Sequence, residues 1–194
     1  MTAGEARRYI AYENAATLVR SYEPERVPGI LQTRRYAEVV VSALFPRHSQ
    51  AERSRFVDLR LARRQVLDRT STPPRLDLII GELTLRRQVG SSEVVREQIQ
   101  SLLDITAEHP TVSLRVAPLR VAHPSVFGGP YVVMDLADPA ENGVVYLETR
   151  GAPEFLHTDQ AVDDYRNLHT ELSAVVLTRE DSQSLLSEIL AAST

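Results

Sequence analysis

The sequence of 194 residues contains no cysteine, no lysine and no tryptophan, and only 6% of its residues are aromatic. Without cysteine, the chain can form neither disulfides nor thiolate metal sites. With so few aromatic rings, a stacking platform for single-stranded nucleic acid is not expected. All 22 basic residues are arginine, which we interpret as the codon bias of a GC-rich genome and not as chemistry.

Long hydrophobic runs and a surplus of positive charge are missing as well. The chain begins MTAGEARR, which lacks the apolar core of a signal peptide, and no stretch approaches a membrane span. We therefore expect a cytoplasmic protein without membrane association. The net charge of −4 argues against a surface built to coat a polyanion. The 43% of hydrophobic residues suffices for one sizeable core or two small ones.

The first 70 residues predict three helices, over residues 5–20, 32–44 and about 49–69. The first has apolar or aromatic residues at helical spacing, namely Tyr9, Tyr12, Ala16 and Val19. Ser49 with Glu52 three residues later is the pattern of a capping box, which favours a helix beginning there.

The rest of the chain predicts strands and helices in alternation. Their approximate ranges are a strand over 75–80, a helix over 91–109, a strand over 112–116, a hairpin of strands over 130–136 and 144–148, and two helices within 159–192 that are broken near 177–178. A strand, a helix and a strand in succession favour a right-handed parallel crossover.

We therefore predict an α+β (mixed α/β) fold that forms one domain over residues 1–194. A helical N-terminal subdomain, residues 1–70, is expected to pack on a small mixed sheet. The sheet-containing core, residues 75–150, contributes the βαβ unit and the hairpin. Residues 159–192 supply the C-terminal helices.

Sequence motifs for common catalytic and cofactor sites are missing. None of the five histidines has a partner at the spacing of a metal-binding helix, and no P-loop, nucleophile elbow or dinucleotide fingerprint occurs. We predict neither a metal nor a cofactor. The arginine row between Arg53 and Arg69 could follow a phosphate backbone, but a solvated helix face with carboxylate partners explains it better.

Glu82 is the most informative single residue, because it stands where the apolar strand Leu76–Ile80 should end, with only Gly81 between them. Its carboxylate either forms a core ion pair with Arg86 or Arg87, or makes the floor of a binding site. The sequence leaves both interpretations open. Tyr146 and Glu148 lie two residues apart on a predicted strand and should point to one side of the sheet.

The candidate site combines polar and aromatic residues at strand ends and helix starts. His123 is included because its loop position would let it act, although a surface loop residue explains it more simply. The candidate ligand-binding residues are Gln32, Tyr36, Glu82, Arg86, Gln98, His123, Tyr131, Tyr146 and Glu148.

Several motifs occur together in one order along the chain. They are VPGILQT (27–33) with Tyr36-Ala37, RLARRQVL (60–67), GELTLRRQVG (81–90), REQI (96–99), VAPL (116–119) and VVYLE (144–148). In these motifs, from about Tyr9 to Ile189, the chain resembles the antitoxin-like C-terminal domain of actinobacterial helix-turn-helix regulators of the xenobiotic-response-element (XRE) type.

That resemblance implies an effector- or partner-binding domain, often linked to a small partner protein encoded nearby. In the family a DNA-binding domain normally precedes it, whereas this sequence begins almost at the first helix, so we expect no direct DNA binding. The expected partner is a small-molecule ligand or a small protein, and a homodimer remains open. The alternative is a cofactor-independent cyclase or isomerase that uses Glu82 as acid or base in a pocket between the helices and the sheet.

Overall fold

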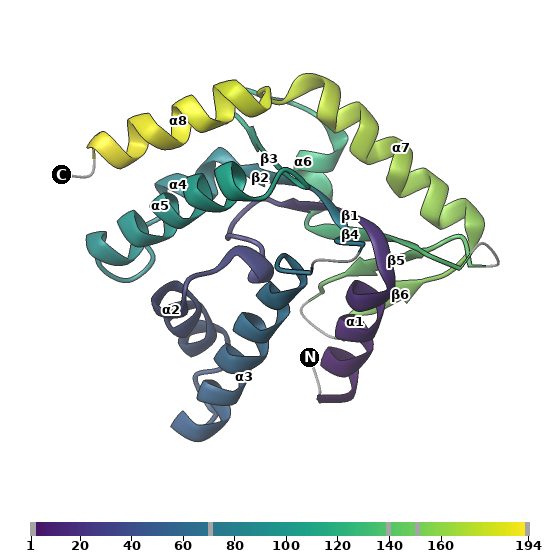
Figure 1. Cartoon of the computed structure of the whole chain (residues 1–194), viewed down its shortest axis with the longest axis horizontal. Helices are drawn as coiled ribbons and strands as arrows, with labels where there is room; N and C mark the ends of the chain where they lie inside the picture. Colours follow the sequence, from purple (N-terminus) through teal and green to yellow (C-terminus); the bar gives the residue numbers. More distant parts are fainter. Residues whose placement is uncertain (1–2, 70–71, 139–140, 150–151, 193–194) are drawn as a thin grey trace.

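The computed structural model describes residues 3–69, 72–138, 141–149 and 152–192 (Figure 1). The strands are β1 (Ala16–Glu23), β2 (Arg75–Gly81), β3 (Val112–Ala117), β4 (Tyr131–Leu136), β5 (Val144–Leu147) and β6 (Glu154–Leu156). The α-helices are α1 (Ala3–Ala15), α2 (Arg34–Leu44), α3 (Gln50–Arg63), α4 (Glu82–Arg86), α5 (Ser92–Glu108), α6 (Pro124–Gly128), α7 (Asp159–Val175) and α8 (Arg179–Ala192). Two 3₁₀ turns are η1 (Gly29–Leu31) and η2 (Arg64–Val66).

The described strands form one mixed sheet in the order β3-β2-β1-β4-β5-β6. β1, β2 and β3 run parallel, while β4, β5 and β6 pair antiparallel with their neighbours. The fold is α+β, as the sequence predicts. The parallel pair β2–β3 connected through α5 and the β4–β5 hairpin are both present.

The prediction of a helix over residues 5–20 is wrong for residues 16–20. The helix ends at Ala15, and the chain continues as β1 in the interior of the sheet. Ala16 and Val19 are three residues apart, which fits a helix face, but the surrounding strands β2 and β4 provide hydrogen-bond ladders on both sides of this segment. Tertiary pairing therefore overrides a short helical spacing that has no strong cap.

Helices cover the two faces of the sheet unequally (Figure 1). α7 and the short α6 cover one face, where Tyr22, Ile79 and Val133 are buried. α1, η1 and α5 cover the other face, where Leu76, Leu78 and their neighbours form the larger apolar core. α8 packs on α5 and on the edge strand β3.

Local capping signals coincide with the helix starts. Ser49 forms the capping box with Glu52 at the start of α3, and Thr178 accepts a hydrogen bond from the Asp181 amide at the start of α8. The helix predicted from Gln32 begins at Arg34, because the Thr33 hydroxyl caps it. Within the described ranges, no helix is both long and apolar enough to cross a bilayer.

Candidate functional site

A cavity of about 140 Å³ lies between the larger-core face of the sheet and the helices α1 and α3. Its floor consists of side chains from β1, β2, β4 and β5, including Leu76, Leu78 and Val132. The η1 turn and the ends of α2 and α3 complete the wall. Three of the predicted site residues, Gln32, Tyr146 and Glu148, line this cavity.

Strand register places the polar groups of the floor. Val132 pairs with Ser21 on one side and with Tyr146 on the other, so these three residues form a row across β1, β4 and β5. Two residues further along their strands, Glu23 and Glu148 extend from the same face because side chains alternate with period two. The sheet thus presents two carboxylates at one end of the cavity.

Arg26 bridges these two carboxylates. Its guanidinium donates to Glu148, and its Nε lies 3.5 Å from a Glu23 oxygen. Burial raises the pKa of Glu23 to about 7, and the Glu148 charge adds to this effect, while Arg26, Arg63 and Arg60 oppose it. Glu23 is therefore able to take up or release a proton near neutral pH.

A second ion pair closes the cavity between α1 and α3. Arg63 donates from Nε and Nη2 to the two carboxylate oxygens of Glu13, at 2.7 and 2.8 Å. The Arg63 guanidinium also lies 4.6 Å from the ring centre of Tyr9. Glu13 is 3% exposed, so the pair is a buried link between the two helices.

Arg60 is bound differently from the other two arginines of the cavity. Its Nη1 donates to the side-chain oxygen of Gln32 at 2.9 Å, and Gln32 in turn donates to the Val27 carbonyl. No carboxylate of the described residues lies within ion-pair distance of Arg60. Burial, together with the charges of Arg26 and Arg63, lowers the pKa of Arg60 to about 10, so it stays charged at neutral pH.

Tyr36 and Gln98 lie behind the cavity wall and hold the turn that carries Gln32. The Tyr36 hydroxyl accepts from the Val27 amide at 3.3 Å. Gln98 accepts from the Thr33 amide at 2.8 Å and donates to the Leu31 carbonyl at 2.9 Å. Both side chains are buried, so they position the turn and do not line the cavity.

Glu82 and Arg86 lie outside the cavity. Arg86 donates to one Glu82 oxygen at 2.6 Å, and the Leu119 amide donates to the other at 3.0 Å. Gly81 makes room for a neighbouring backbone, since a Cβ there would lie 2.6 Å from the Pro24 carbonyl oxygen. Glu148 emerges at the same end of the sheet as Glu82, but β1 and β4 lie between β2 and β5.

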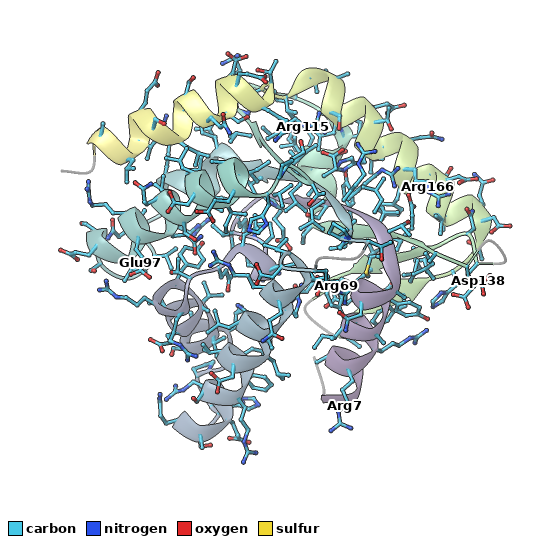
Figure 2. All side chains as sticks on the ribbon, viewed as in Figure 1. Arg7, Arg69, Glu97, Arg115, Asp138 and Arg166 are labelled. Atoms are coloured by element: carbon cyan, nitrogen blue, oxygen red, sulfur yellow. The ribbon has the colours of Figure 1, made fainter. Side chains whose placement is uncertain are left out.

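Tyr131 and His123 belong to the opposite face of the sheet. The Tyr131 hydroxyl lies 3.3 Å from His169 Nδ1, and His169 Nε2 lies 3.4 Å from Asp77. His123 caps α6 by accepting from the Ser125 amide. Figure 2 shows this side of the sheet beneath α7, with Arg115 under its end. Tyr131 and His123, which the sequence placed in the site, therefore lie across the sheet from the cavity.

Sequence reasoning missed most of the charged and polar residues that line the cavity: Glu13, Ser21, Glu23, Arg26, Arg60 and Arg63. Arg60 and Arg63 were expected on a solvated face, but both turn inward. The available signal was the period-two series Val19, Ser21 and Glu23, which a helix assignment conceals. In the described ranges, no three histidine or acidic residues are grouped as metal ligands.

Comparison with models of known families matches residues 6–188 to "Domain of unknown function (DUF5753)". The chain belongs to this family. No curated protein and no solved structure matches it significantly. In this DUF5753 domain, charged and polar side chains converge on the apolar cavity between α1, α3 and the sheet.

Proposed function

We propose that this DUF5753 domain is an effector-binding domain related to actinobacterial XRE-type regulators, and that a small molecule occupies its cavity. The observation that carries the proposal is an apolar cavity into which a few charged and polar side chains converge, which is the usual composition of a small-molecule site. An apolar cavity of about 150 Å³ accommodates benzene, so the ligand would insert a group of about that size.

Three of the six arginines between Arg53 and Arg69 support a ligand site better than a DNA-binding surface. Arg63 pairs with Glu13, and Arg60 faces the cavity. Beyond the helix, Arg69 donates to the Asn14 backbone and side chain. Phosphate binding needs guanidinium groups that face outward, and these three are engaged elsewhere.

A cofactor-independent enzyme is the second candidate function, and Glu23 is the observation that favours it. A carboxyl group with a pKa of about 7 in a partly enclosed cavity has the property required of a general acid or base. Glu82, the acid or base of our sequence hypothesis, has both carboxylate oxygens engaged and does not line the cavity.

The experiment that tests ligand binding is a fragment titration observed by nuclear magnetic resonance. The fragments are single-ring compounds that are neutral, anionic or cationic. We expect binding to the wild type that Val132→Phe abolishes, because the larger ring would fill the floor of the cavity. Val175→Phe is the matched control, since Val175 is 48% exposed on α7. Binding that survives Val132→Phe would place the ligand elsewhere.

A further inference from the structure

The three arginines of the cavity differ in how their charges are compensated. Arg63 has Glu13 as its partner, and Arg26 has Glu148 and Glu23. Arg60 donates only to a neutral amide oxygen, that of Gln32, among the contacts of the described residues. Removing a guanidinium from water without a counter-ion is unfavourable, so this charge favours the entry of an anion.

Ser21 is a second polar group in the cavity whose interactions are incomplete. Its hydroxyl lies in the floor, on β1, and finds no hydrogen-bond partner in the part of the chain that the structure describes. The residue is only 3% exposed. Buried hydroxyl groups are normally hydrogen-bonded, so an acceptor or donor from a bound molecule would complete this one.

The charge balance of the cavity favours an anion over a cation. Three arginines face three glutamates, Glu13, Glu23 and Glu148. Glu23 is partly protonated near neutral pH, so positive charges then outnumber negative ones. A cationic ligand would meet three guanidinium groups, whereas a monoanion would balance the excess positive charge that is present when Glu23 is protonated.

We propose that the cavity binds the carboxylate of a small, mostly apolar acid, with Arg60 as its counter-ion and Ser21 as a second hydrogen-bond donor. A guanidinium binds a carboxylate through charge-assisted hydrogen bonds, and the nitrogens of Arg60 that do not contact Gln32 are available for them. The apolar part of the acid packs on Leu76 and Leu78. This inference deepens the proposed function and rests on it.

Three probes with one skeleton test the charge preference: 3-phenylpropionate, 3-phenylpropanamide and 3-phenylpropylamine. Titration of the full chain at pH 7 should show the carboxylate binding about tenfold more tightly than the amide, and the amine binding most weakly. Equal binding of the acid and the amide would overturn the proposal. Tighter binding of the amine would also overturn it and would make Glu23 the recognition group.

Arg60→Gln removes the charge and keeps an amide donor toward Gln32. It should abolish the preference for the carboxylate, while Arg60→Lys should retain part of it. Arg55→Gln is the matched control, because Arg55 is an exposed residue of the same helix that does not line the cavity. Arg55→Gln should keep the full preference, and if Arg60→Gln kept it as well, Arg60 would not be the counter-ion.

Ser21→Ala provides a second variant that does not depend on how Arg60→Gln folds, which circular dichroism would show. Ser21→Ala should weaken the binding of 3-phenylpropionate about threefold and leave the binding of 3-phenylpropylamine unchanged. An unchanged affinity would remove Ser21 from the site. If single-ring neutral fragments bind the cavity but none of the three probes does, the ligand class is wrong and the proposed function stands. If no fragment binds, the proposed function itself fails.

Discussion

Glu13 of α1 and Arg63 of α3 form a two-bond ion pair at 2.7 and 2.8 Å that joins the two helices flanking the cavity. The two residues are 50 positions apart in the sequence. Their exposed side-chain fractions are 4% for Glu13 and 17% for Arg63. The pair therefore fixes the width of the cavity from a position largely excluded from water.

We expect Glu13→Gln to lower the free energy of unfolding by about 3–5 kcal/mol, because it leaves Arg63 buried without its counter-ion. Urea unfolding measures the change. Glu97→Gln removes the exposed pair with Arg35, and it should cost less than about 1 kcal/mol. Equal effects of the two substitutions would mean that the Glu13–Arg63 pair is not buried in solution.

Glu23 gives the stability of the protein a pH dependence with a defined sign. Its pKa of about 7 in the folded state exceeds the ordinary value of 4.5, so between these values the folded state keeps a proton that the unfolded state has lost. The free energy of unfolding should therefore fall as pH rises from about 4.5 to 7. The charged groups that face Glu23 are Arg26, Arg60, Arg63 and Glu148.

Glu23→Gln mimics the protonated acid, so we expect it to match the wild type near pH 5. At pH 8 the variant should be more stable by about 1–3 kcal/mol, because it lacks the buried charge. Urea unfolding at both pH values provides the measurement, and Glu97→Gln should follow the wild type throughout. A difference that does not change with pH would show that Glu23 ionises as an exposed acid does.

Glu82→Gln separates the structural role of this residue from the acid–base role. The hydrogen bond from the Leu119 amide, aided by Arg86, lowers the pKa of Glu82, so its contribution to stability is present above the ordinary pKa and is lost as pH falls through the lowered one. At pH 7 we expect Glu82→Gln to lower the free energy of unfolding by about 1–2 kcal/mol, as measured by thermal unfolding. The affinity for the fragments should not change. An unchanged melting temperature with lost binding would restore Glu82 to the site.

Tyr36→Ala should destabilise the fold by about 3–5 kcal/mol, since the ring is 2% exposed and packs in the larger core. Tyr36→Phe removes only the acceptor for the Val27 amide and should cost about 1–2 kcal/mol. Phe127→Ala, at an 81% exposed ring on α6, is the control and should change stability by less than about 0.5 kcal/mol. Thermal unfolding ranks the three variants. A Tyr36→Ala protein as stable as the control would show that α2, which carries Tyr36, is peripheral to the fold.

The sequence by itself determined the elements whose signals are local. Ser49 and Glu52 specify the start of α3, and Thr178 with Asp181 specifies the start of α8, because capping bonds join residues three positions apart. Tyr146 and Glu148 were correctly expected on one side of a strand, since alternation depends only on the strand itself.

Tertiary structure alone decided what depends on distant partners. The segment 16–23 became a strand because β2 and β4 satisfy its backbone on both sides, and this places Ser21 and Glu23 in the cavity floor. Arg60 and Arg63 resembled a solvated helix face, yet α3 lies across the cavity from α1, and both side chains turn toward that cavity. The packing of the helices on the sheet decides which charged side chains share the cavity. No residue spacing in the sequence predicts that grouping.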